Sequence, residues 1–118
     1  MKRIVVGGQI DKKRIASMVE TIAGDQVTVE IKGDIEAAMA VKTGAADLYL
    51  GACNTGGGGA LAMAIAILGL SSCSTISMPG NIKSEQEIKA EVEAGKKAFG
   101  FTAQDIDVVV PVLLKYVL

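Results

Sequence analysis

Asp-Leu-Tyr-Leu-Gly-Ala-Cys-Asn-Thr-Gly-Gly-Gly-Gly, at residues 47–59, is the stretch that decides the fold of this chain. A short apolar run ends there in glycines and small polar residues, and the uninterrupted apolar segment 60–70 follows. This order predicts a strand, a turn and the start of a helix. Helix N-termini carry unpaired N–H groups and a partial positive charge, so the turn, which contains Cys53, is a candidate anion site.

The composition is typical of one α/β domain spanning residues 1–118. Half of the 118 residues are apolar, but only 3% are aromatic. Alanine, valine, isoleucine and glycine supply most of the apolar content, which favours a buried parallel sheet with closely packed helices.

Charge and residue usage exclude several classes of function. The net charge is −1, from 12 basic and 13 acidic residues, so no nucleic-acid partner is expected. The chain has no histidine, and its two cysteines lack a CxxC spacing, so we expect no metal site, no disulfide and no cofactor. The apolar run at the N-terminus is too short for a signal-peptide core. Segment 60–70 falls short of the roughly 20 residues of a membrane span, so we expect a cytoplasmic protein without a membrane partner.

Strands alternate with helices along the rest of the chain. Apolar runs predict strands at 3–6, 26–31 (nearer an edge), 46–50, 73–77 and 98–101. Helical spacing predicts helices at 12–23, 35–43, 58–69, 85–97 and after 102. An alternative interpretation makes 108–110 a sixth strand. The alternation predicts a three-layer α/β/α sandwich with a five-stranded, mainly parallel, Rossmann-like sheet.

Several polar residues are expected to fix the helix ends. Asp11 and Thr102 are predicted N-caps, and Ser84 with Glu87 predicts a capping box. Pairs at i,i+4 are expected at 85–89 and 93–97 on a solvent-facing helix. Pro111 is expected to bend the last helix.

In parallel sheets the ligand lies beyond the carboxyl ends of the strands, so loops 7–9, 51–58 and 77–81 are the predicted site. The candidate ligand-binding residues are Gly8, Gln9, Asn54, Thr55, Gly56, Gly57, Gly58, Gly59 and Asn81. Cys53 is the candidate catalytic residue, because a cysteine beside a helix N-terminus has a favoured thiolate. Lys83 and Arg14 are the nearest plausible cations for a phosphate.

Each of these residues also has a purely structural interpretation. The glycines suit a tight turn, Asn54 and Thr55 suit a helix cap, and Cys53 suits a small buried filler. Asp47 opens a strand at the far edge, where a structural role is expected. Cys73 is expected in the core.

Segment 38–56, Met78-Pro79-Gly80 and the stretch 95–101 resemble the YhfU-like family of bacterial proteins, over the whole chain. That resemblance implies no activity.

A second, more distant resemblance covers residues 36–69. Gly44, Ala46, Asp47, Cys53, Thr55, Gly56 and Gly58 resemble the ribose-5-phosphate isomerase B and galactose-6-phosphate isomerase family. It implies that Cys53 is the base that moves a proton between adjacent sugar carbons, while the N–H groups of the glycine loop hold the enediolate oxygens. Those isomerases carry an Asp-His pair where this chain has Gly8-Gln9, they place arginines on the phosphate, and they have a glycine in place of Asn54.

Two functions therefore stay open. One is a sugar-phosphate isomerase-like enzyme acting on a small phosphorylated or polyhydroxy metabolite, and the other is a non-catalytic ligand-binding or accessory subunit. A phosphotransferase-system IIB component would carry its cysteine after the first strand, and a dinucleotide-binding domain would carry its glycines there. In this chain the cysteine and the glycine run follow the third predicted strand, so both alternatives are disfavoured.

The helix at 58–69 has no polar face, so we expect a homodimer or higher homo-oligomer that buries Leu61, Ile65 and Leu68 between subunits.

Overall fold

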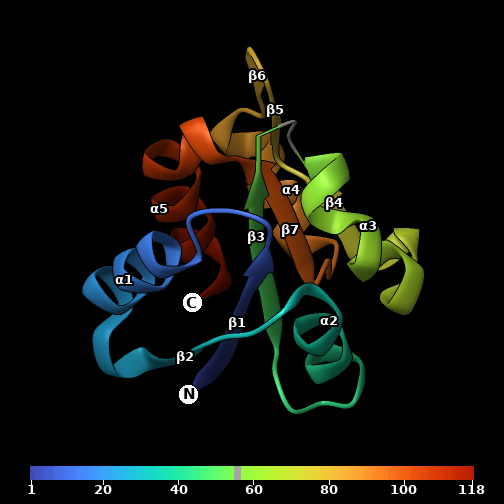
Figure 1. Cartoon of the computed structure of the whole chain (residues 1–118). Helices are drawn as coiled ribbons and strands as arrows, with labels where there is room; N and C mark the ends of the chain where they lie inside the picture. Colours follow the sequence, from blue (N-terminus) through green and yellow to red (C-terminus); the bar gives the residue numbers. More distant parts are fainter. Residues whose placement is uncertain (55–56) are drawn as a thin grey trace.

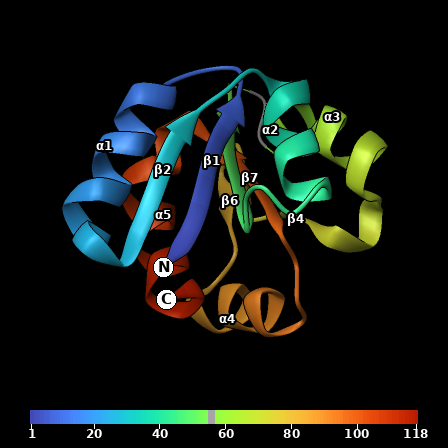
Figure 2. The same ribbon diagram turned by 90° about the horizontal axis from the view of Figure 1, so that it is seen from below.

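The computed structural model describes residues 1–54 and 57–118, with side chains for 1–54 and 61–118. Its centre is a five-stranded parallel sheet covered by helices on both faces, as Figures 1 and 2 show. The predicted three-layer α/β/α sandwich with a parallel sheet is confirmed.

The strands stand in the order β2-β1-β3-β7-β4. Their bounds are β1 Lys2–Gly8, β2 Val27–Ile31, β3 Leu48–Cys53, β4 Cys73–Thr75 and β7 Ala98–Thr102. Two short strands, β5 Ser77–Met78 and β6 Asn81–Ile82, form an antiparallel hairpin outside the sheet. Strand β3 is central and buried along its whole length, which explains its nearly continuous apolar sequence.

The helices divide between the two faces of the sheet. The helices α1 Lys12–Ala23, α4 Glu85–Glu93 and α5 Ile106–Val117 form one layer, and α2 Asp34–Lys42 and α3 Gly57–Leu68 form the other (Figure 2). Single 3₁₀ turns lie at Gly24–Gln26, Leu70–Ser72 and Ala103–Asp105. Alternate residues of β3 enter two separate cores: Leu48, Leu50 and Ala52 face α1 and α5, while Tyr49 faces α2 and α3.

Strand three begins and ends later than the predicted 46–50. It runs from Leu48 to Cys53, so Cys53 is the last residue of the strand and does not lie in the turn. The reason is the ladder on both sides, since Ala52 pairs with Gly8 of β1 and Cys53 with Thr102 of β7. The predicted strand at 73–77 is divided, because β4 ends at Thr75 and Ser77 belongs to the hairpin.

Several predicted helices have shifted ends. Helix α1 has the predicted bounds, whereas α3 begins at Gly57, so three of the four glycines belong to its first turn. Helix α4 ends at Glu93, four residues before the predicted end. Residues 108–110 are helical within α5, so the alternative sixth strand is wrong.

The capping box of Ser84 and Glu87 is confirmed, but the other two predicted caps are wrong. Asp11 precedes α1 with a left-handed backbone, and its side chain makes no cap hydrogen bond. A 3₁₀ turn separates Thr102 from α5, whose first residue is Ile106.

The expected i,i+4 pairs of α4 do not form among the described residues. Glu85 instead bonds Lys115 and Tyr116 of α5, because α4 packs beside that helix. None of the helices that the structure describes is long and apolar enough to cross a membrane.

Candidate functional site

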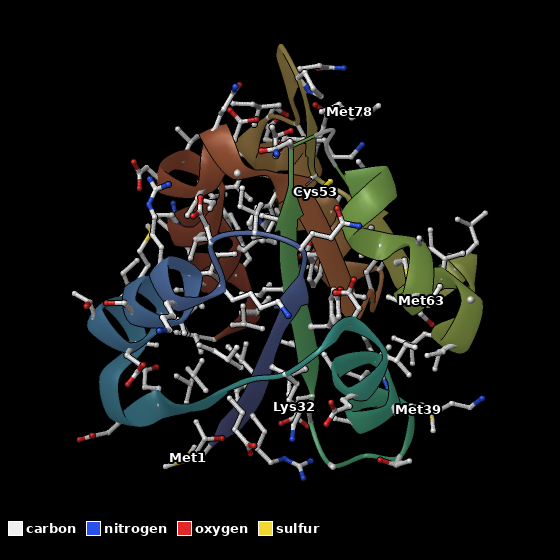
Figure 3. All side chains as sticks on the ribbon, in the orientation of Figure 1. Met1, Lys32, Met39, Cys53, Met63 and Met78 are labelled. Carbon is white, nitrogen blue, oxygen red and sulfur yellow. The ribbon has the colours of Figure 1, made fainter. Side chains whose placement is uncertain are left out.

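Cys53 lies at the carboxyl edge of the sheet, in the middle of its width. It is the last residue of β3, flanked by β1 and β7, and its side chain is only 1% exposed. Its partner in register is Thr102, the last residue of β7. Cys53 and Met78 of the hairpin lie at one end of the molecule and Met1 at the other, as Figure 3 shows.

The chain leaves the sheet in opposite directions around Cys53. The connections after β1 and β7 lead to α1 and α5 on one face, whereas the connection after β3 leads to α3 on the other (Figure 1). In open α/β sheets, a crevice forms at the carboxyl ends of two neighbouring strands whose connections lead to opposite faces, and ligands bind in this crevice. The predicted site therefore coincides with the switch point of the observed topology.

The first predicted loop packs tightly against β3. Gly8 has a φ of +81°, and a Cβ there would lie 2.7 Å from the backbone nitrogen of Ala52, so only glycine fits. The N–H of Gln9 donates to the carbonyl oxygen of Ala52 at 2.9 Å, and the Gln9 side chain is exposed. This loop brings the backbone of β1 within reach of the end of β3.

Three glycines form a row across the sheet beside this loop, and sequence reasoning missed it. Gly7 pairs in register with Gly51, and Gly51 with Gly100. The ring of Tyr49 occupies the space above Gly7 and Gly51: a Cβ on Gly7 would lie 2.6 Å from Cε2 of that ring, and one on Gly51 would lie 3.0 Å from Cε1. These glycines are far apart in the sequence and become neighbours only through the pairing of β1, β3 and β7, so the sequence alone gives no signal for the row.

The Tyr49 hydroxyl links three elements at the carboxyl edge. It accepts a hydrogen bond from the N–H of Gly8 at 3.0 Å and donates one to Oδ1 of Asp34, the first residue of α2, at 3.3 Å. Burial, followed by the charge of Asp34, raises the pKa of Tyr49 well above its usual value of 10.0. Tyr49 is therefore a neutral, positioned hydroxyl, and its role is to fix β1 against α2.

Two buried hydroxyls lie on the other side of Cys53. The N–H of Thr102 donates to Oγ of Ser77 at 2.9 Å, and the two residues are 0% and 2% exposed. Within the described part of the chain, Oγ1 of Thr102 has no hydrogen-bond partner. A buried hydroxyl without a partner is unusual in proteins and calls for an explanation. The only sequence signal for it was a threonine that ends an apolar strand.

Of the other candidate ligand-binding residues, those that the structure describes lie at the carboxyl edge. Asn54 is exposed directly after β3, and Gly57, Gly58 and Gly59 form the first turn of α3. Thr55 and Gly56 lie outside the described residues. Asn81 is exposed on β6, at the same edge as Ser77.

Other residues lie away from this edge, as expected. Cys73 is buried at the start of β4, on the far edge from Cys53, and burial raises the pKa of its thiol. Both cysteines are thiols. Asp47 pairs with Arg3, with Oδ1 3.2 Å from Nη2, in agreement with the structural role expected for it.

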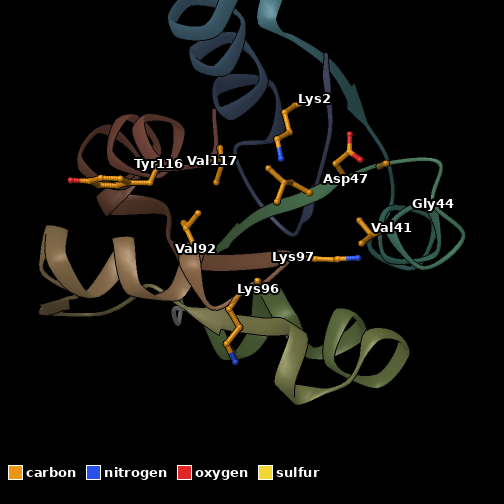
Figure 4. Close-up of a pocket in the computed structure, with 12 residues that line it drawn as sticks. Lys2, Val41, Gly44, Asp47, Val92, Lys96, Lys97, Tyr116 and Val117 are labelled. Carbon is orange, nitrogen blue, oxygen red and sulfur yellow. The ribbon is translucent and has the colours of Figure 1, made fainter.

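A cavity of about 410 Å³ lies at the opposite, amino edge of the sheet (Figure 4). Lys2, Lys96 and Lys97 line it together with Asp47. The C-terminal ends of α2, α4 and α5 meet here, and lysines at such ends offset the partial negative charge of the helices. At the carboxyl edge a smaller cavity, of about 240 Å³, includes Ser77 and Asn81.

The comparisons with known proteins match the chain over nearly its full length. Residues 2–117 match the family described as "Protein of unknown function DUF2620". The chain is 39% identical over 116 residues to "Uncharacterized protein YhfU" of Escherichia coli (strain K12) and of Shigella flexneri, covering 98% of this chain and 98% of each relative. No solved structure matches it. The chain belongs to the DUF2620 family and to the same family as the YhfU proteins.

Proposed function

We propose that this protein binds a small phosphorylated or polyhydroxy metabolite, probed most simply as an anion, at the carboxyl end of β3. The observation that carries the proposal is the divergence of the chain around Cys53, where β3 leads to α3 while β1 and β7 lead to the opposite face. The binding residues are those of the Gly8-Gln9 loop, Asn54, the segment 55–59 and Asn81.

The chemistry of this edge suits an oxygen-rich anion. The first N–H groups of α3 have no acceptor within their own helix, and glycines at 57–59 keep side chains away from them. The unpartnered hydroxyl of Thr102 adds a donor and acceptor next to Cys53.

A catalytic role for Cys53 is the second candidate, favoured by its place at the end of the central strand. In an isomerase-like reaction its thiolate would take a proton from the hydroxyl-bearing carbon beside a carbonyl group and return it to the former carbonyl carbon, while the hydroxyl proton passes to the former carbonyl oxygen, so no atom is gained or lost. The side chain is 1% exposed, so this reaction requires the ligand to reach a buried sulfur. Binding has no such requirement, and it is the function that the geometry supports best.

Titration with inorganic phosphate and ribose 5-phosphate, followed by amide NMR shifts, tests the proposal. We expect shifts at Gly8, Gln9 and Asn54 in the wild-type protein, and loss of binding in Gly57→Val, which places a branched side chain in the first turn of α3. The matched control is Ala90→Val on the exposed face of α4, which should bind like the wild type. Absence of binding by the wild-type protein, with no small molecule detected by mass spectrometry after native purification, would overturn the proposal.

We also propose that the protein is a homodimer that pairs through the outer face of α3. This helix has no polar side chain between Leu61 and Leu68, and Met63 is 38% exposed. Leu61 does not belong to this surface, contrary to expectation, because it is 1% exposed and packs in the core beneath α2 and α3. Ile65 and Leu68 are half-buried and stay available to a partner.

A further inference from the structure

The cavity of about 240 Å³ at the carboxyl edge is built mainly from the hairpin and the residues that lead into it. Its walls are Thr75, Ile76, Ser77, Met78, Asn81 and Lys83. They offer two hydroxyls, one amide and one ammonium group, so four polar side chains of different geometry meet around one small space.

One wall residue, Ser77, is buried and is joined to Thr102 of β7, which lies beside the cavity and is not itself a wall residue. Ser77 is 2% exposed and holds the N–H of Thr102 through its Oγ at 2.9 Å, which leaves its hydroxyl hydrogen able to donate. Thr102, 0% exposed, has an Oγ1 without a partner among the described residues. A hydroxyl that is both buried and unpartnered indicates a place for a polar ligand atom beside Ser77.

Of the two candidate cations, Lys83 and Arg14, Lys83 is the one that remains available. Arg14, the other candidate, is held by Asp107 at 2.7 Å and lies 3.9 Å from Asp11. Lys83 takes part in none of the ion pairs between described residues, while its backbone N–H is fixed by the carbonyl oxygen of Ile76 at 2.9 Å.

The acidic group that faces Lys83 from α4 is already engaged. Oε1 of Glu87 accepts the N–H of Ser84 at 2.9 Å, and this capping bond, more than the charge of Lys83, lowers the pKa of Glu87. The ammonium group of Lys83 is therefore not committed to Glu87 and can serve a ligand.

We propose that the ligand carries a phosphate monoester and that Lys83, with Asn81 and Ser77, binds this phosphate group. An ammonium, an amide and a hydroxyl donate from different directions, which suits the three terminal oxygens of a phosphate better than the two of a carboxylate. The rest of the ligand extends along the sheet edge toward Thr102 and Cys53. This inference rests on the proposed function, because it names the charged group of the same ligand and the side chain that recognises it.

Inorganic phosphate is the probe that tests the inference, titrated at constant ionic strength and followed by amide NMR shifts. In Lys83→Met we expect the dissociation constant for phosphate to rise about tenfold or more, as for loss of one charge-assisted contact. Lys83→Arg should retain most of the affinity. Arg14→Met is the matched control, since it removes one positive charge on α1 and should change the constant by less than about twofold. Acetate at the same concentration should bind more weakly than phosphate to the wild-type protein.

The outcomes separate the two proposals. Equal affinities of Lys83→Met and Arg14→Met for phosphate would overturn this inference. If Gly57→Val loses binding in that case while Lys83→Met and Arg14→Met keep it, the proposed function stands without the role of Lys83. A wild-type protein that binds neither phosphate nor ribose 5-phosphate would overturn both. Lys83 is only partly buried, so its replacement is expected to fold, and thermal unfolding verifies this.

Discussion

The backbone N–H of Gly8 donates a hydrogen bond to the hydroxyl of Tyr49 at 3.0 Å, and this bond ties the last residue of β1 to a side chain from near the start of the neighbouring strand β3. Tyr49 lies on β3 two residues before Gly51. Its ring covers Gly51 and Gly7, and its hydroxyl reaches Gly8 beyond them. The first loop of the proposed site is therefore positioned by a side chain for which the sequence predicted no role.

Removing the Tyr49 hydroxyl should destabilise the protein. In Tyr49→Phe the buried N–H of Gly8 loses its acceptor, and a buried donor without a partner costs about 1–3 kcal/mol. Urea unfolding at pH 7 measures the difference. Tyr116→Phe is the control, because its hydroxyl bonds Glu85 on the exposed side of α5 and should matter less. Equal stability of Tyr49→Phe and the wild type would contradict the assigned role.

The same tyrosine predicts a loss of stability in alkaline solution. Burial raises the pKa of Tyr49 in the folded protein, whereas in the unfolded chain it titrates near its usual value of 10.0. Below pH 10 both states keep the proton, and the stabilisation is fully present. Above pH 10 only the unfolded chain ionises, so the free energy of unfolding falls as the pH rises. Unfolding curves between pH 9 and about 11.5 should show a shallower decline for Tyr49→Phe than for the wild type.

A methyl group on Gly7 should collide with the Tyr49 ring. The added Cβ would lie 2.6 Å from Cε2 and 3.0 Å from the Cβ of Ala37, so we expect Gly7→Ala to cost about 1–3 kcal/mol, as overpacked cores do. Gly33→Ala is the matched control, since its Cβ would meet only Oε1 of Glu36 at 3.5 Å.

The double variant Gly7→Ala with Tyr49→Leu tests the cause of that cost. Removing the ring should remove most of the penalty of the alanine, which thermal or urea unfolding of the four proteins of the cycle will show. Additive effects of the two changes would mean that the ring does not fill the space above Gly7.

Cys53 should resist alkylation in the folded protein. Its side chain is 1% exposed, so iodoacetamide should label it, in a Cys73→Ala background, about 100-fold more slowly than in the urea-unfolded chain. Ribose 5-phosphate should slow the reaction further if the ligand lies against the sulfur.

Charge on the outer face of α3 should separate the proposed dimer. Met63→Lys places an ammonium group on this apolar helix and should convert the protein to a monomer in sedimentation experiments at micromolar concentration. Val108→Lys is the control, because Val108 is 55% exposed on α5, in the opposite layer. A wild-type protein that sediments as a monomer at that concentration would reject the dimer.

Local patterns in the sequence predicted the layers and most elements correctly. The apolar spacing of Ile15 and Val19 gave α1 with its observed bounds, because that helix is amphipathic and buries a single face. Ser84 and Glu87 predicted the start of α4, since a capping box is formed entirely by residues three apart.

Features that depend on neighbouring strands were not predictable in this way. The extension of β3 to Cys53 follows from pairing with Gly8 and Thr102, which lie about 45 and 49 residues away in the chain. The division of the strand at 73–77 likewise follows from the return of the hairpin through Asn81. The sequence places the candidate site at the carboxyl edge because strand ends gather there, and that placement stays a prediction. The positions of Tyr49, Ser77 and Thr102 around this edge became visible only with the strand order.

In the described part of the chain, β5 and β6 pair with each other and with no strand of the five-stranded sheet. The hairpin is attached to that sheet at its base, where the N–H of Ile76 donates to the carbonyl oxygen of Gly100 at 2.8 Å and Oγ of Ser77 accepts the N–H of Thr102. Its tip at Gly80 has a φ of +75° and open space around it. Residues can therefore be inserted or removed at the tip without disturbing a single bond of the five-stranded ladder. The length of the hairpin and the stability of the sheet can therefore vary independently, and the proposed phosphate site lies on the part that is free to vary.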